Sequence, residues 1–200
     1  MSTSDIIKNV IAEGTKEMIR ETSVESITVT EICEKTGVNR RTFYRYFRDK
    51  FDVINWIYYN DALMKFDHYE SWSIFDYMPR IMESLYRDKK YYINALKYKG
   101  QNSFRDYCTS CLEKLIKPDY SNWFSSEHQL AFFTHNLCEM TYDACIYWLQ
   151  YEPNRPPESF SASYRDFLVT YCSRSLDLLI TRHESREKEI IVQHSEPAKQ

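Results

Sequence analysis

Apolar residues recur along this chain at intervals of three and four, the period of helices that bury one face. The clearest runs lie near residues 7–18, 74–85, 130–148 and 164–179. We find no notable segment in which apolar and polar residues alternate, and the chain has only 3 glycines and 6 prolines. The pattern therefore predicts an all-α protein.

The segment from Thr28 to Lys50 has the signals of two short helices joined by a turn. Thr28 and Glu31 have the spacing of a capping box, which predicts a helix beginning at about Val29. Gly37 can adopt the positive φ that ends a helix. Asn39 is a favourable N-cap for the next helix.

The second of these helices combines aromatic and basic residues. Phe43 and Phe47 lie four residues apart and share one face, which we expect to be buried. The arginines of this helix then remain on its exposed surface. A helix, a short glycine turn and a basic helix form the helix-turn-helix pattern.

The charge distribution singles out the same segment. Residues 35–50 hold six cations against Asp49, a net charge of +5, whereas the whole chain has −3 and the remainder therefore −8. An acidic protein with one concentrated basic patch is suited to bind one polyanion through that patch.

The stretch GVNRRTFYRYFRDKFDVI resembles the signature of the TetR family of bacterial transcriptional regulators. This chain has Arg41 where the family often has glycine before the threonine. Residues 95–107, ALKYKGQNSFRDY, resemble a subgroup of this family that includes activators of dihydroxyacetone-kinase operons. The matching family positions are Gly37, Val38, Thr42, Phe43, Tyr44, Tyr46, Phe47 and Lys50.

The resemblance implies a three-helix DNA-binding domain followed by a helical ligand-binding and dimerisation domain. We place these domains at residues 1–48 and 49–183, with a disordered tail at 184–200. A continuous helix from Asp49 to about His68, some 30 Å long, is expected to join the two domains as a rigid lever.

The predicted DNA contacts fall into two groups. We assign base reading to Arg40, Arg41 and Tyr44, because arginine can pair bidentately with guanine and tyrosine can contact a thymine methyl. Arg45 is expected to add attraction to the DNA backbone. By analogy with matching family positions, the residues predicted to contact phosphates are Thr28, Thr42, Tyr46 and Lys50.

The last two helices carry long apolar stripes, which indicate either a core within one chain or the face of a homodimer. TetR relatives form a four-helix bundle from these helices, so we expect the dimer. The predicted partners are a double-stranded DNA operator with near-palindromic sequence and a second copy of the chain. The predicted dimer residues are Tyr147, Trp148, Tyr164, Phe167, Tyr171 and Leu178.

The resemblance also implies a small-molecule effector in the second domain, although aromatic and methionine stripes are also typical of a plain core. The candidate pocket residues are Tyr58, Phe66, Tyr77, Met82, Phe104, Tyr107, Met140 and Tyr142. One alternative is a zinc sensor, because Cys108, Cys111, His135 and Cys138 include the pairs CxxC and HxxC. Another is an activator whose second domain binds a protein.

Other function classes lack their signals in this sequence. No run of 18 apolar residues predicts a membrane span, and the polar N-terminus is unlike a signal peptide. We expect six reduced cysteines in a cytoplasmic protein. No dinucleotide, phosphate-loop, hydrolase or metalloprotease motif is present, so we expect neither an enzyme nor a cofactor.

Overall fold

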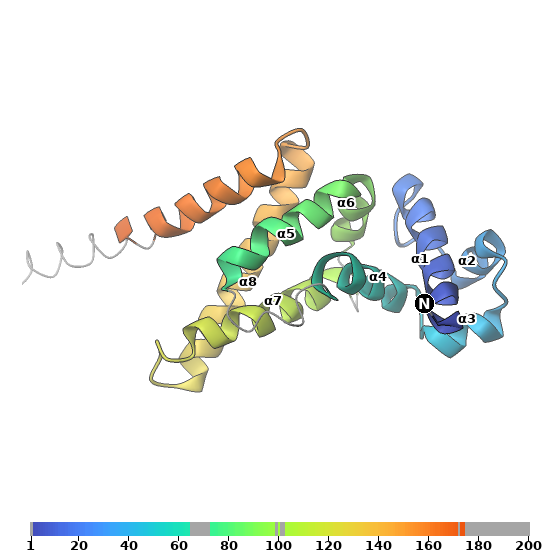
Figure 1. Ribbon diagram of the computed structural model, residues 1–200, viewed down its shortest axis with the longest axis horizontal. Coiled ribbons are helices and arrows are strands. Elements are labelled where there is room, and N and C mark those ends of the chain that lie inside the picture. Colours follow the sequence, from blue (N-terminus) through green and yellow to red (C-terminus); the bar gives the residue numbers. More distant parts are fainter. Residues whose placement is uncertain (1, 65–72, 99, 101–102, 172, 175–200) are drawn as a thin grey trace, which may run out of the picture. The chain divides into compact units, whose positions relative to one another are not determined.

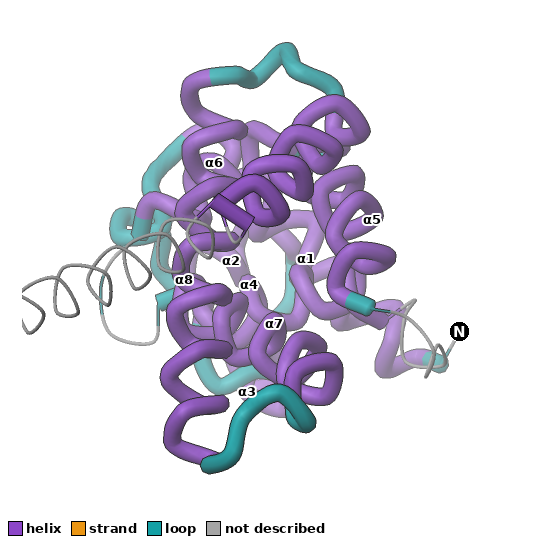
Figure 2. The backbone as a smooth tube through the Cα atoms, turned by 90° about the vertical axis from the view of Figure 1, so that its left-hand side faces the viewer, coloured by secondary structure: helices purple, strands orange, loops and turns teal. Residues whose placement is uncertain are grey.

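The computed structural model describes residues 2–64, 73–98, 100, 103–171 and 173–174. Every regular element in these residues is a helix, which confirms the predicted all-α class (Figure 2). The chain divides into two compact units, residues 1–158 and 159–200. No helix of the described residues is both long and apolar enough to cross a membrane.

The first three helices form the N-terminal part of the larger unit (Figure 1). They are α1 (Thr3–Glu21), α2 (Val29–Thr36) and α3 (Arg40–Tyr46). A capping box of Ser2 and Asp5 starts α1, since the Asp5 amide donates to Ser2 Oγ and the Ser2 amide donates to the Asp5 carboxylate.

The next helix differs from the continuous lever that the sequence suggested. Helix α4 (Lys50–Tyr58) begins at its predicted N-cap, where Asp49 Oδ1 accepts the Asp52 amide at 2.8 Å. It then widens into the π-helix η1 (Tyr59–Leu63). The part of the predicted lever beyond residue 64 lies outside the described residues.

The remaining helices of the larger unit are α5 (Ile74–Arg87), α6 (Lys89–Lys97), α7 (Phe104–Tyr120) and α8 (Glu127–Tyr151). Helix α7 packs along α8, and α5 packs against η1, α6 and α7. Further helical residues follow at 157–171 and 173–174; from residue 159 onward they belong to the smaller unit.

Helix α1 packs in two directions. One set of contacts joins it to α2 and α4, and a second set joins it to α6. Ile11 and Ile19 are at most 1% exposed, so α1 buries apolar side chains along its length. The boundary predicted at residues 48/49 therefore lies inside one compact unit.

The close approach of α1 and α2 depends on Gly14. A Cβ atom at this position would lie 2.3 Å from Cγ2 of Thr36. We expect Gly14→Ala to lower the free energy of unfolding, because the overlap costs about 1–3 kcal/mol and outweighs the better helix propensity of alanine. Chemical denaturation measures the change.

The matched control removes the obstructing methyl group. Thr36→Ser deletes Cγ2 but keeps the hydroxyl, which donates to the Ile32 carbonyl at 2.7 Å. We expect Gly14→Ala to become neutral or stabilising in the Thr36→Ser background. An equal loss in both backgrounds would contradict the steric explanation.

Candidate nucleic-acid interface

The turn between α2 and α3 has the predicted geometry. Gly37 ends α2 at φ 69° and ψ 8°, in the left-handed region that favours glycine. Asn39 Oδ1 accepts the Thr42 amide at 2.9 Å and starts α3. The two helices are therefore fixed as a helix-turn-helix.

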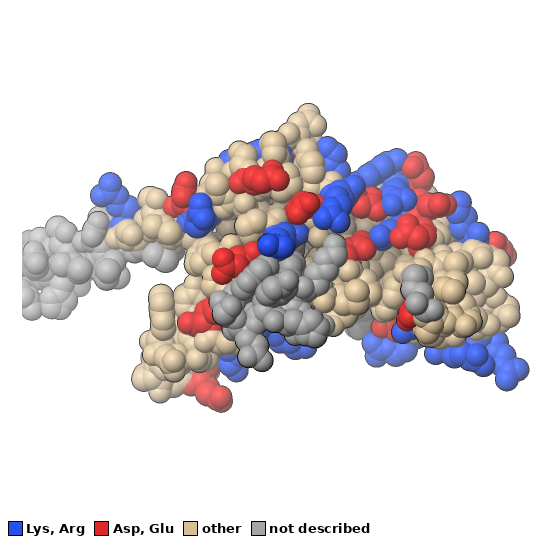
Figure 3. All heavy atoms as spheres, in the orientation of Figure 1, with Lys and Arg blue, Asp and Glu red and all other residues tan. Residues whose placement is uncertain are grey.

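Helix α3 has one buried and one exposed side. Phe43 is fully buried and Phe47, which follows the helix, is 3% exposed. The opposite side presents Tyr44, which is 49% exposed. Arg40, Arg41 and Arg45 are also exposed. Figure 3 shows Lys and Arg side chains along the edge of the molecule at α3.

The arginines of α3 differ in how firmly they are held. Arg40 Nη1 donates to Thr30 Oγ1 at 3.3 Å, and its guanidinium carbon lies 6.0 Å from the centre of the Tyr44 ring. Within the described part of the chain, Arg41 and Arg45 make no intramolecular hydrogen bond or ion pair. Arg40 is thus oriented in advance, whereas Arg41 and Arg45 are available to a ligand.

Two further cations of the basic segment have acidic neighbours. Lys35 Nζ lies 2.8 Å from a Glu17 carboxylate oxygen, so its charge is largely compensated. Arg48 Nη2 lies 3.6 Å from Asp52 Oδ1, but the Arg48 side chain remains 87% exposed. The net charge of +5 therefore overstates the number of free cations at this surface.

Thr28 is the N-cap of α2. Its hydroxyl accepts the Glu31 amide at 3.2 Å and donates to Glu31 Oε2 at 2.8 Å. The hydrogen bonds from the Thr28 hydroxyl and amide lower the pKa of the Glu31 carboxyl. The predicted capping box is confirmed, and it occupies the hydroxyl for which a phosphate contact was also predicted.

Lys50 requires a correction to the sequence prediction. Its ammonium donates to three backbone carbonyls, those of Val24 at 2.6 Å, Glu25 at 3.1 Å and Ile27 at 2.7 Å. A lysine has three N–H donors, so none remains for a phosphate in this arrangement. Lys50 instead holds the α1–α2 loop against the start of α4. The other predicted phosphate residues, Thr42 and Tyr46, are half-buried.

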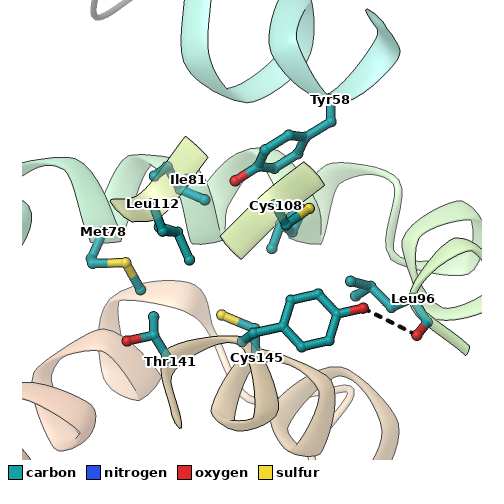
Figure 4. Close-up of a pocket in the computed structure, with 10 residues that line it drawn as sticks. Tyr58, Met78, Ile81, Leu96, Cys108, Leu112, Thr141 and Cys145 are labelled. Atoms are coloured by element: carbon teal, nitrogen blue, oxygen red, sulfur yellow. Dashed lines mark hydrogen bonds between the residues drawn. The ribbon is translucent and has the colours of Figure 1, made fainter. Parts of the chain in front are cut away.

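The second half of the larger unit contains a small apolar cavity (Figure 4). Two of the predicted pocket residues, Tyr58 and Tyr142, line it, and the Tyr142 hydroxyl donates to the Leu96 carbonyl at 3.2 Å. Its volume of about 20 Å³ has room for about one water molecule. The cavity is therefore closed to an effector of several heavy atoms in this conformation.

The other predicted pocket residues that the structure describes do not line this cavity. Tyr77, Met82 and Phe104 are buried in the core, and Met82 is fully so. Tyr107 and Met140 are half-buried, and Phe66 lies outside the described residues. The residues missed by sequence reasoning are Met78, Ile81, Leu85, Leu96, Cys108, Leu112, Thr141 and Cys145.

The cysteine and histidine pairs do not converge on a metal site. Among the described residues, no group of three or more His, Cys, Asp or Glu side chains could hold a metal ion. Burial raises the pKa of the Cys108 thiol well above its usual value and that of Cys138 to about 12. His135 is exposed. These features are those of buried, protonated thiols.

The predicted dimer residues are also distributed unevenly. Tyr147 is exposed on α8, and so is Tyr151, which was not predicted; their ring centres lie 5.2 Å apart. Trp148 is a correction, because it is fully buried, stacks on Tyr86 at 5.6 Å, and donates from Nε1 to the Arg155 carbonyl. It has no surface to offer a second copy.

The remaining predicted dimer residues belong to the smaller unit. Phe167 and Tyr171 are exposed there, and their ring centres are 6.0 Å apart. The ring of Tyr164 lies 6.2 Å from that of Phe167. Leu178 lies outside the described residues.

The exposed basic face of α3, set by a glycine turn and two caps, is typical of a helix-turn-helix DNA-binding domain. Residues 11–55 match the family described as bacterial regulatory proteins, tetR family. This N-terminal segment is therefore similar to the tetR family, as its signature predicted.

One curated relative and one solved structure are similar to this chain. The HTH-type dhaKLM operon transcriptional activator DhaS of Lactococcus lactis subsp. lactis (strain IL1403) is 31% identical over 61 residues. That match covers 30% of this chain and 33% of the relative, about a third of its length.

A solved structure of dihydroxyacetone kinase operon activator DhaS matches with a TM-score of 0.55. The superposition covers 82% of this chain and 94% of the other, at 17% sequence identity. At this level of identity, the likeness shows a shared fold.

Lys50→Met separates a structural role from a phosphate contact. We expect it to lower the free energy of unfolding by about 1–3 kcal/mol, because three carbonyls lose their common donor. The slope of log affinity for DNA against log salt should remain that of the wild type. Lys35→Met, at an exposed ion pair, is the control for stability. A slope reduced by about 1 for Lys50→Met would restore the phosphate role.

Proposed function

We propose that this protein is a one-component transcriptional regulator that binds double-stranded DNA of a particular sequence. The observation that carries the proposal is the exposed face of α3, where Arg40, Arg41, Arg45 and Tyr44 lie opposite the buried Phe43. The α3 face enters a major groove, and its cations also attract the phosphate backbone.

The two leading arginines have different parts in recognition. Arg40, held by Thr30 and beside Tyr44, loses little side-chain freedom when it pairs with a guanine. Arg41 is not held and adapts to the base pair beside it. A bidentate arginine–guanine contact gives about 1–3 kcal/mol of discrimination against the wrong base.

The protein acts as a homodimer in this proposal. Tyr147 and Tyr151 on α8, together with Phe132, leave large apolar rings exposed on one helix face. Burial of this face against a second copy would bring two α3 helices to half-sites of a near-palindromic operator. Their centres would lie one helical turn or a multiple of a turn apart.

A small-molecule effector is one means of control, and it requires the cavity beside Tyr58 to open. The small size of this cavity, about 20 Å³, favours a second candidate, in which a protein partner controls the C-terminal region. The similarity to an operon activator supports activation as the outcome. Native mass spectrometry of the protein purified from its own cells distinguishes the two through the mass of the bound partner.

Arg41→Ala and Arg45→Ala test the assignment of base and backbone contacts. With a library of operator variants, we expect Arg41→Ala to relax the preference at one base pair and leave the other positions unchanged. Arg45→Ala should weaken all sequences similarly and reduce the salt slope by about 0.9. A uniform loss for both variants would contradict the assignment.

The dimer surface is tested with Tyr147→Lys combined with Tyr151→Lys. We expect this double variant to sediment as a monomer at concentrations where the wild type is a dimer, because two lysines would be buried at the interface. Trp123→Lys, at an aromatic side chain that is 73% exposed elsewhere, is the control. An unchanged sedimentation coefficient in the double variant would place the dimer surface elsewhere.

A further inference from the structure

Asp61 connects the DNA-binding helices to the C-terminal helices of the larger unit. Its Oδ2 atom lies 2.8 Å from Lys16 Nζ on α1 and accepts the Tyr92 hydroxyl of α6 at 3.2 Å. The Lys16 side chain is 10% exposed and that of Asp61 is 33% exposed. One carboxylate oxygen thus holds two helices that belong to different parts of the fold.

The contact between Lys16 and Asp61 offsets the cost of burying the Lys16 charge. Burial alone would lower the pKa of the Lys16 ammonium, but the hydrogen bonds and charges of Asp61 and, to a lesser extent, of Glu13 at 3.3 Å outweigh it and raise that pKa. Separation of the pair would leave a largely buried cation without its principal partner. The pair therefore favours one position of α1 relative to η1.

Asp61 lies within the π-helix η1, which begins directly after the cavity residue Tyr58. The Tyr58 ring lies 5.3 Å from the Phe104 ring, which in turn lies 6.3 Å from that of Tyr92. Packed rings therefore connect the cavity wall to the second hydrogen-bond partner of Asp61. A structural change at the cavity can therefore reach the Asp61 carboxylate through these packed rings.

A π-helix can exist in two registers. If its wide turn moves past Asp61, the helix register there changes by one residue, and the side chain rotates by about 100°. That rotation would take the carboxylate away from Lys16. The buried Tyr91 hydroxyl has no hydrogen-bond partner in the described structure. An unpaired buried donor costs free energy in the observed state.

A separate set of contacts can act as the pivot. Arg20 Nε donates to Asp88 Oδ1 at 2.9 Å, and Asn94 Nδ2 donates to the Ile19 carbonyl at 2.8 Å. These contacts join the end of α1 to α6 and do not involve η1. Rotation about them would move α2 and α3 together with α1.

We propose that Lys16, Asp61 and Tyr92 form a switch contact through which opening of the Tyr58 cavity releases α1 and repositions the DNA-reading helix. The proposal rests on the proposed function, because it supplies the regulation of that DNA-binding surface. Release of Asp61 from Lys16 is the step that couples the cavity to the DNA-reading helix.

The first test measures amide hydrogen exchange in the full-length protein. We expect Asp61→Asn to accelerate exchange at residues 12–19 and 59–63 at least tenfold, with exchange in α8 unchanged. Lys90→Met is the matched control, because it removes an exposed ion pair with Glu21 between the same two helices, and it should change these rates less than twofold. Uniform acceleration along the whole chain in Asp61→Asn would overturn the proposal.

The second test fills the cavity. Cys145→Leu, or Leu112→Phe if the former does not fold, should accelerate exchange in α1 at least fivefold in the wild-type background. In the Asp61→Asn background the same substitution should add less than twofold. Equal effects in both backgrounds would overturn the proposal. This test needs no DNA, so it remains decisive if the protein proves to bind no particular sequence.

The third test measures affinity for DNA selected by the wild-type protein. We expect Asp61→Asn to change that affinity at least tenfold with an unchanged salt slope, because the phosphate contacts stay the same. An affinity within twofold of the wild type, in a variant with accelerated exchange in α1, would overturn the link to DNA binding. Failure of the wild type to select any sequence would instead refute the proposed function.

Discussion

The larger unit depends on one constraint, the packing of α1 against two groups of helices at once. This helix holds α2 and α4 on one side and α6 on another, so it belongs to the DNA-binding domain and to the helices behind it. Gly14 permits the first contact by letting Thr36 approach, and Arg20 with Asp88 secures the second. The position of α3 follows from the position of α1.

In this arrangement, the basic residues near the turn have different roles. Lys50 holds the α1–α2 loop and so stabilises the domain, whereas Lys35 pairs with Glu17 at the surface. Arg40, Arg41 and Arg45 remain exposed on α3. A count of charge in the sequence cannot separate these tasks, because the separation depends on which carbonyls and carboxylates the fold brings near each ammonium.

The parts of the structure that sequence analysis predicted are those with local causes. The capping box at Thr28, the left-handed Gly37 and the cap at Asn39 each depend on residues within four positions, so their geometry follows from the sequence. The all-α class follows from periodicity in the same way. The base-reading residues predicted for α3, Arg40, Arg41 and Tyr44, are exposed as expected because Phe43 and Phe47 fix the opposite face.

The parts that were missed depend on contacts between distant segments. Lys50 meets carbonyls more than twenty residues away, and Asp61 meets Lys16 on another helix. Trp148 fits an apolar stripe, but only the folded chain shows Tyr86 and the Arg155 carbonyl against it. The widening of the helix after Tyr58 has no signal in the apolar pattern, and only Tyr58 and Tyr142 of the cavity lining were predicted.

The central claim is that α3 reads double-stranded DNA as one half of a symmetric pair. Selection of bound duplexes from a random pool tests it most directly, at a stated salt concentration. The account predicts enrichment of an inverted repeat whose half-site centres lie one helical turn, about 34–36 Å, or a multiple of a turn apart. Recovery of duplexes with no enriched sequence, bound no more tightly than the starting pool, would contradict it.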